Sequence, residues 1–489
     1  MNKIFLTTLL IIGIGVIHSS YAQSHDNLKI DESLISNIEV QSALHILESW
    51  IESTMKNQEQ PGLSIGIVYN QDLIWAKGFG FADIANKVEA TPSTLYRIAS
   101  ISKLFTSTAI MQLRDEEKLQ LDDPVAKHLT WFNIENLYPQ SPTVTIRHLL
   151  THTSGLPREP TGVNWCDLTF PTRQEMIQNL SKQKTVFPAE KEWKYSNLAL
   201  SLAGEIVAVV SGVPWEDYIQ KKILQPLKMG RTTPIAESDL SGLAVGYGRR
   251  VPGSSRSIEP FVDPGAIRPA GNLVSNVEDL AKFVSLQFSD NKLEGRKILK
   301  NSTINEMHRV QWLRPDWKSG WGLGYEVKRI DDITRVGHGG SLPGYRCYLE
   351  MAPEFKFGVI VLTNADDGNP RLYTSKAFEF LFPAIKRATE SFITISEPDP
   401  DWNKYTGVYT WKNSDIEISI LNNKLTMILP EDDNPLKSRI TLEPVSKHMF
   451  RAFPAQWHYS LNGEIMTFEF NEEGEIVRFG NANFYWIPK

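Results

Sequence analysis

The hydrophobic pattern of this chain changes at Pro398-Asp399-Pro400-Asp401, and no other feature of the sequence constrains the fold more. Before this stretch, segments such as residues 40–56 repeat apolar side chains at three- and four-residue steps, as amphipathic helices do. After it, Ile416, Ile418 and Ile420 alternate with polar residues, as in half-buried strands. Residues that precede proline avoid helical backbone, so we expect a linker here. A chain of 489 residues predicts two or three domains.

The first part of the chain mixes strands and helices in a set order. Residues 63–69 and 73–80 read as a hairpin, 345–351 and 357–362 read as later strands, and the segments between them include helical patterns. Strands at both ends with helices between them predict one discontinuous α/β domain. The expected divisions are a signal peptide at 1–22, a polar lead at 23–39, the α/β domain at 40–396, a linker at 397–404, and a small antiparallel β domain, a barrel or a sandwich, at 405–489.

The N-terminus resembles an export signal. Lys3 supplies a positive charge, residues 4–17 are apolar, and Ser20-Tyr21-Ala22 offers small residues where a signal peptidase cleaves. The apolar run is shorter than the roughly 20 residues that a membrane-spanning helix needs. We therefore expect an exported protein, periplasmic or secreted, with no stable membrane span after cleavage. An uncleaved anchor is the alternative.

The net charge and the motifs limit the kinds of molecule that this chain is expected to bind. The net charge of −6, without a concentrated basic run, argues against a nucleic-acid partner. No H-E-x-x-H motif or close Cys-His group is present, so we expect no metal and no other cofactor. Cys166 and Cys347 are the two cysteines, and they could be bridged or could be separate thiols. A small-molecule or peptide substrate remains the expected partner, and the oligomeric state stays open.

The tetrad Ser100-Ile101-Ser102-Lys103 is the first candidate catalytic element. Residues three apart lie on one face of a helix, so Lys103 can reach the Ser100 hydroxyl and take its proton if the amine is neutral. The same spacing occurs at Ser53–Lys56, Ser181–Lys184 and Ser289–Lys292. Ser100 is favoured because an apolar helix follows it, whereas the other three lie among polar residues. The alternative role for Ser100 is a helix N-cap.

Two further elements carry polar groups suited to catalysis. Tyr195-Ser196-Asn197 is the single Y-x-N, in which a phenol can relay protons and Asn can orient partners. His338-Gly339-Gly340-Ser341 is the single H-x-G, and glycines there allow a substrate backbone to approach closely. A core Tyr beside a capping Asn, and a glycine turn that feeds the strand at residues 345–351, are the alternatives.

The three elements occur in the order and rough spacing of the serine β-lactamase and penicillin-binding-protein superfamily, and the chain resembles its class C-like branch. Residues 148–157 and 269–275 also resemble scaffold stretches of that family. The resemblance implies an antiparallel sheet flanked by helices plus a helical subdomain. It implies that Ser100 is the nucleophile, Lys103 its activating base, and Tyr195 a general base in acylation or deacylation. It further implies that Asn197 orients the substrate and Lys103, and that backbone N–H groups of Ser100 and Ser341 hold the oxyanion.

The chain departs from the family pattern at His338, where the usual residue is Lys. A histidine is mostly neutral at pH 7, so a substrate carboxylate loses a fixed positive partner at His338-Gly339-Gly340. The sequence thus predicts an exported serine hydrolase that acts on a D-amino-acid peptide, a small ester or a β-lactam. A class C-like β-lactamase proper and a non-catalytic muropeptide or penicillin sensor are alternatives. A third is a glycan- or protein-binding C-terminal domain, although its aromatics, Trp411, Trp457 and Tyr485, are expected in a barrel core.

Overall fold

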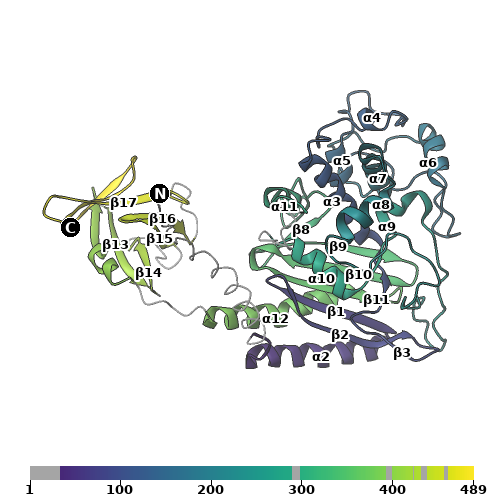
Figure 1. The fold of residues 1–489 in the computed structure, drawn as a ribbon, viewed down its shortest axis with the longest axis horizontal. Helices are drawn as coiled ribbons and strands as arrows, with labels where there is room; N and C mark the ends of the chain where they lie inside the picture. The colour runs from purple at the N-terminus through teal and green to yellow at the C-terminus, as the bar shows by residue number, and fades with distance from the viewer. Residues whose placement is uncertain are drawn as a thin grey trace, which may run out of the picture. The chain divides into compact units, whose positions relative to one another are not determined.

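The structure is a computed structural model that describes residues 34–288, 298–392, 399–412, 414–421, 423–430, 438–455 and 461–489. The predicted signal peptide and the segment that follows it up to residue 33 lie outside the described residues. The chain divides into two compact units, residues 1–388 and 389–489 (Figure 1). Residues 400–404 of the predicted linker, together with Tyr405, form a short 3-10 helix, η6 (Pro400–Tyr405).

The first unit is built on a nine-stranded antiparallel sheet in which the two ends of the unit meet. The strand order is β3-β2-β1-β11-β10-β9-β8-β7-β6, so the predicted hairpin pairs with the predicted late strands through β1 and β11. In spatial order the strands are β3 (Val88–Glu89), β2 (Asp72–Asp83), β1 (Gly62–Tyr69), β11 (Phe357–Thr363), β10 (Tyr345–Ala352), β9 (Ile333–Leu342), β8 (Glu326–Ile330), β7 (Ser319–Trp321) and β6 (Trp312–Leu313).

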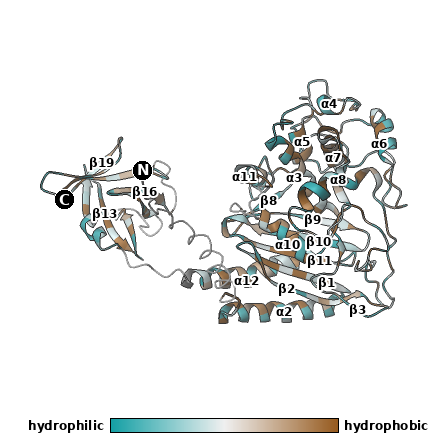
Figure 2. Cartoon of the chain, viewed as in Figure 1, coloured by the Kyte–Doolittle hydropathy of each residue, from teal (hydrophilic) through white to brown (hydrophobic). Residues whose placement is uncertain are grey.

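Two long helices, α2 (Ile38–Gln58) and α12 (Pro370–Phe392), cover one face of this sheet (Figure 1). Asn37 caps α2 by accepting hydrogen bonds from the backbone N–H groups of Glu39 and Val40. Helix α2 carries alternating hydrophobic and hydrophilic patches (Figure 2), and its apolar side chains pack with Leu63, Ile65 and Ile67 of β1. The helix predicted at residues 40–56 is confirmed with slightly wider limits.

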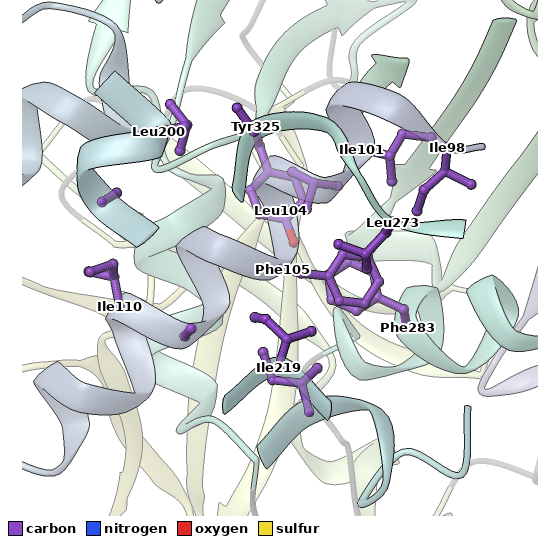
Figure 3. Close-up of a cluster of buried hydrophobic side chains, with 14 of the residues drawn as sticks. Ile98, Ile101, Leu104, Phe105, Ile110, Leu200, Ile219, Leu273, Phe283 and Tyr325 are labelled. Atoms are coloured by element: carbon purple, nitrogen blue, oxygen red, sulfur yellow. The ribbon is translucent and has the colours of Figure 1, made fainter. Parts of the chain in front are cut away.

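The opposite face of the sheet carries α10 (Val277–Leu286) and a helical subdomain. Gly66 of β1 lets α10 lie close, since a Cβ there would come within 2.3 Å of Val277 Cγ1. Phe105 stacks on Phe283 at 4.1 Å between ring centroids in the apolar cluster that joins the two layers (Figure 3). The remaining elements are β4 (Tyr96–Arg97), η1 (Ala99–Ile101), α3 (Ser102–Asp115), α4 (Val125–His128), α5 (Ile146–Thr151), α6 (Arg173–Asn179), η2 (Leu180–Lys182), α7 (Asn197–Ser211), α8 (Trp215–Ile219), the π-helical η3 (Gln220–Leu224), η4 (Gly265–Ile267), α9 (Arg268–Gly271), β5 (Val274–Ser275), α11 (Asn301–His308) and η5 (Pro353–Phe355).

No single helix among the described residues has the length and apolar character to cross a membrane. The pair formed by residues 197–211 and 215–224 meets both criteria together but is bent by 76°. Residues 197–207 of this pair are buried in the core of the first unit.

The second unit is a closed antiparallel barrel, which decides between the two architectures predicted for the C-terminal domain. Its strands are β12 (Gly407–Trp411), β13 (Ser414–Leu421), β14 (Lys424–Ile428), β15 (Ile440–Ser446), β16 (Met449–Pro454), β17 (Ile465–Phe470), β18 (Ile476–Gly480) and β19 (Tyr485–Pro488). The expectation that its aromatics are core residues is wrong for Trp411 and Tyr485, which are 45% and 46% exposed, because both lie where their strands turn a side chain outward. Trp457 lies outside the described residues.

Candidate active site

Ser100 lies where the chain turns from β4 into α3. Ala99, just before it, has a φ of 48°, in the left-handed region that costs an L-residue about 1 to 2 kcal/mol. The caps of the two helices here are Ile98 for η1 and Ile101 for α3, so the alternative role of Ser100 as an N-cap is wrong. The Ser100 side chain is half-buried and lines a cavity instead.

Lys103 is fully buried one turn further along α3, with 0% exposure. Its Nζ lies 2.9 Å from Oγ of Ser100 and donates to the backbone oxygen of Ala270 at 2.7 Å. Burial away from water holds the pKa of Lys103 well below its usual value. Nearby Glu159 opposes this shift in pKa, and Arg158 adds to it. The structure therefore brings the Lys103 amine within hydrogen-bonding distance of Ser100 Oγ, and the lowered pKa favours the neutral form of that amine.

The stretch at residues 269–275, expected to be scaffold, holds the start of α3. Besides the Ala270 oxygen that binds Lys103, Pro269 O accepts from Thr106 Oγ1 at 2.6 Å. The backbone N–H of Leu273 donates to Ser102 Oγ at 3.0 Å. Hydrogen bonds from residues 269–273 therefore hold the side chains in the first turns of α3. The bond to the Ala270 oxygen orients the Lys103 side chain.

Tyr195 meets Ser100 from the loop before α7. A hydrogen bond joins the Tyr195 and Ser100 side chains, and the Lys103 Nζ lies 4.9 Å from the Tyr195 ring centroid. Burial raises the pKa of Tyr195, and the hydrogen bond to Ser100 opposes that rise only in part. At neutral pH the side chain is a phenol that can donate a proton, which is a different starting state from the phenolate of a general base.

Asn197 begins α7, and among the described residues its side chain makes no hydrogen bond to Lys103. Its Nδ2 donates to Oε1 of Glu159 at 2.7 Å. The same oxygen accepts from Nε of Arg158 at 3.2 Å and from Nε1 of Trp165 at 3.1 Å. Glu159 thus fixes three residues that line the cavity. The sequence analysis missed it because it lies in a loop without periodicity and belongs to no short motif.

His338 lies inside strand β9, so the prediction of glycines placed before the strand at residues 345–351 is wrong. The residues that follow it pair in register with β10: Gly340 lies opposite Cys347 and Ser341 opposite Arg346. The His338 Nδ1 lies 2.5 Å from the backbone oxygen of Gly339, so this nitrogen is the donor and Nε2 carries the lone pair. Burial lowers the pKa of His338 to about 3. The imidazole is therefore neutral, as expected.

Gly340 explains why the H-x-G element contains glycine. A Cβ at this position would lie 2.1 Å from the backbone oxygen of Ile98, two residues before Ser100. Strand β9 and the nucleophile loop therefore touch backbone to backbone. Ser341, the next residue, is exposed and lines the same cavity.

The cavity has a volume of about 1000 Å³ and brings together every predicted site residue except Lys103, which lies buried behind its wall. Aromatic rings line one side: Trp193 and Trp321 lie 5.1 Å apart between centroids. His152, from the stretch expected to be scaffold, lies 4.5 Å from the Tyr195 ring, and its Nδ1 accepts from the Ser196 N–H at 3.2 Å. That stretch therefore supports Tyr195 directly.

The described residues also bear on the expectations for metal ligands and for the two cysteines. Within the part of the chain that the structure describes, no group of three or more His, Cys, Asp or Glu side chains could hold a metal ion. Cys166 is exposed and Cys347 is buried, and both are free thiols that line the cavity. The possible bridge between them is not formed.

Comparisons with known proteins agree on one family. The model of the family described as Beta-lactamase matches residues 47–381. "Beta-lactamase-like protein 2" of Dictyostelium discoideum is 28% identical over 461 residues, which cover 89% of this chain and 83% of that protein. "Protein flp" of Staphylococcus aureus is 29% identical over 329 residues, 65% of this chain and 62% of that protein, so the match spans less than two thirds of flp.

Solved structures share the fold. The octameric penicillin-binding protein homologue from Pyrococcus abyssi superposes with a TM-score of 0.61 at 27% identity, covering 91% of this chain and 99% of that one. A D-stereospecific amidohydrolase from Streptomyces sp. gives a TM-score of 0.57 at 24% identity, covering 68% and 98%. The second likeness concerns the fold alone.

Proposed function

The chain belongs to the beta-lactamase family, and from this premise we propose that it is an exported serine hydrolase that forms an acyl-enzyme at Ser100. One observation carries the proposal. The Lys103 Nζ lies 2.9 Å from Oγ of Ser100 while burial holds the pKa of that amine well below its usual value. A neutral, positioned amine is the group that a serine nucleophile needs to lose its proton.

In acylation, Ser100 Oγ attacks the carbonyl carbon of the substrate while its proton passes to Lys103. The carbonyl π electrons move to oxygen, and the backbone N–H groups of Ser100 and Ser341 hold the resulting oxyanion. The C–N or C–O bond then breaks, and the phenol of Tyr195 donates its proton to the leaving group. Lys103 returns a proton to Tyr195, so the pair ends as it began. The raised pKa of Tyr195 supports this division, with Lys103 as base and Tyr195 as acid.

Deacylation repeats the chemistry with water. A water molecule attacks the acyl carbon as its proton passes to Lys103, and the Ser100 oxygen leaves with a proton from Tyr195. Lys103 then returns its proton to Tyr195, which restores both groups. We propose that Asn197, which donates a hydrogen bond to Glu159, orients the substrate amide.

Substrate choice follows from the neutral imidazole of His338. A penicillin carboxylate would find no fixed charge on β9, whereas a neutral ester or a D-amino-acid amide needs none. We propose that esters and D-amino-acid derivatives outrank penicillins.

Fluorophosphonate labelling followed by intact-mass spectrometry tests the nucleophile. Nitrocefin, D-Ala-D-Ala peptide, D-amino-acid amides and p-nitrophenyl esters, each given to wild type and Ser100→Ala, test the substrate order. An adduct on another serine contradicts the site. Nitrocefin turnover above every ester and amide contradicts the substrate class and favours the β-lactamase alternative.

The proposed export is tested separately, by locating the N-terminus of the mature protein. We propose that the mature protein begins at Gln23, after Ser20-Tyr21-Ala22. N-terminal sequencing of the exported fraction should find Gln23, and a retained Met1 would contradict cleavage.

A further inference from the structure

Arg314 is an uncommitted cation in the wall of the active-site cavity. It lies in the turn between β6 and β7, where its backbone N–H donates to Ser319 O at 2.9 Å. Its guanidinium lies over the ring of Trp193, with Cζ 4.6 Å from the centroid, and both residues line the cavity. Within the described residues, this guanidinium has neither a hydrogen-bond acceptor nor an ion-pair partner.

Asp316, the nearest acid in sequence, makes no hydrogen bond to this guanidinium among the described residues, although the charge of Arg314 adds to the hydrogen bonds that lower the pKa of Asp316. The carboxylate of Asp316 accepts hydrogen bonds from the backbone N–H groups of Lys318 and Ser319 and from Ser319 Oγ, which close the turn. Its oxygens are therefore taken up within the turn. A planar guanidinium stacked on an indole keeps its N–H edge free to meet a planar anion.

Two of the acidic residues that line the cavity are held in ion pairs, whereas the third, Glu259, accepts a hydrogen bond from Ser257 Oγ. Glu326 binds Arg371 at 2.9 Å and Lys328 at 3.3 Å. Asp366 binds Arg346 at 2.9 Å. These pairs cancel their charges locally, and neither of them involves Arg314.

A second guanidinium lies on the same aromatic wall. Arg158 has its Cζ 5.3 Å from the Tyr195 ring centroid, and that ring lies 6.3 Å from Trp193. Arg158 binds Glu159 through Nε. The wall beside the nucleophile therefore presents two guanidinium groups, of which that of Arg158 is ion-paired with Glu159, whereas β9 presents a neutral imidazole.

We propose that Arg314, with Arg158 beside it, forms an anion subsite that recognises a carboxylate of the substrate at a distance from the scissile bond. The inference rests on the proposed function, because the bound molecule must also reach Ser100. It deepens that function by naming the substrate class: acyl compounds that carry a carboxylate where it meets the Trp193 wall and not His338. Guanidinium and carboxylate match as bidentate partners, which gives both affinity and orientation.

Arylboronic acids test this subsite without requiring turnover. The boron accepts a lone pair from Ser100 Oγ as the hydroxyl proton passes to Lys103, so a reversible tetrahedral adduct forms. Phenylboronic acid is the neutral probe, and its meta- and para-carboxyl derivatives are the anionic probes. Their Kd values are measured with wild type, Arg314→Gln, Arg314→Lys and the control Arg309→Gln, which changes an exposed arginine outside the cavity lining.

We expect wild type to bind at least one carboxyl derivative about 10- to 100-fold more tightly than phenylboronic acid, the range for a charge-assisted hydrogen-bonded pair. Arg314→Gln should bring this ratio to about 1 without changing the Kd of phenylboronic acid, which also shows that the variant folds. Arg314→Lys should keep part of the preference, and Arg309→Gln all of it.

Two outcomes overturn the proposal, and a third separates it from the proposed function. A wild type without preference, or a preference that survives in Arg314→Gln, shows that Arg314 is no anion anchor while Ser100 stands. If phenylboronic acid binds Ser100→Ala as tightly as wild type, the adduct is not on Ser100, and the proposed function itself fails.

Discussion

Aromatic rings line both the active-site cavity and the interior of the C-terminal barrel, yet the two regions use them differently. In the cavity, Tyr195 and Trp321 surround polar groups, namely a buried lysine and a buried histidine. In the barrel, Phe468 stacks on Phe479 at 4.3 Å and on Tyr405 at 4.4 Å, and the rings mainly meet other apolar side chains.

The difference shows what burial does in each place. Rings around Lys103 keep water out and so weaken its hold on a proton, which prepares a base at a cost in stability. Rings around Phe468 remove apolar area from water, which stabilises the barrel without preparing any group to react. The same side chains thus favour chemistry in one unit and folding in the other.

The largest expected effect falls on the cavity. Ser100→Ala should lower kcat by about 10⁴-fold or more and abolish covalent labelling, because the nucleophile is lost. Ser53→Ala is the matched control, since it changes an exposed S-x-x-K serine on α2. Labelling of wild type and both variants with a fluorophosphonate measures the effect. Equal loss in both variants would show that Ser100 is not the nucleophile.

Lys103→Met separates catalysis from stability. Without the base, we expect kcat/KM to fall by about 10²- to 10⁴-fold, the range for general-base catalysis. In wild type, activity should fall as pH is lowered through the depressed pKa of Lys103, since protonated amine cannot accept a proton. Initial rates across pH measure this limb, and its persistence in Lys103→Met would show that another group titrates.

The same variant should be more stable at neutral pH. Below the usual lysine pKa near 10.4 the unfolded chain binds a proton that the folded chain resists, so Lys103 destabilises the fold as pH falls. Methionine removes that penalty, and the gain should shrink as pH approaches 10. Denaturant titrations at several pH values measure it, and a loss of stability in Lys103→Met would contradict the sign.

Phe468→Ala tests the role of aromatic packing in the stability of the barrel. A buried phenylalanine replaced by alanine costs about 3 to 5 kcal/mol, which should lower the free energy of unfolding of the barrel. Labelling of Ser100 should be unchanged in the folded full-length protein. The exposed Phe453, 39% accessible, provides the control Phe453→Ala. Barrel unfolding is followed by denaturant titration, and equal costs at both positions would contradict the assigned core.

His338→Lys is expected to have the smallest effect. A lysine there would restore a fixed charge, worth about 1 to 3 kcal/mol to a carboxylate, or roughly 5- to 150-fold in relative kcat/KM. The ratio for nitrocefin over a p-nitrophenyl ester measures the shift. If the ratio does not change, His338 has no part in selecting substrates.

Much of the fold was predictable because hydrophobic residues repeat with the period of a helix or a strand, and turn residues mark where these segments end. The hairpin β1–β2, strands β10 and β11, and helix α2 follow the predicted segments closely, and α3 is the apolar helix expected after Ser100. Tyr195 and His338 were identified because they belong to short motifs in a fixed order. The pattern near His338 was misread because two glycines suggest a turn, whereas here they sit in a strand pressed against another backbone.

The remaining site residues depend on contacts that no local pattern encodes. Glu159 and Arg314 lie in irregular loops, and their roles arise from Asn197 and Trp193, which are distant in sequence. Likewise, Trp411 was expected inside the barrel because composition does not say which face of a strand a residue takes.

The contact between Gly340 and Ile98 also limits how this chain can change over generations. Every single-base substitution that alters a glycine codon to another amino acid introduces a Cβ, and here a Cβ would lie 2.1 Å from a backbone oxygen. No alternative residue can be sampled at Gly340 without displacing the loop that carries Ser100. New specificities in this lineage are therefore expected to arise at positions such as Arg314 and Ser341, whose side chains border open space, while Gly340 stays fixed.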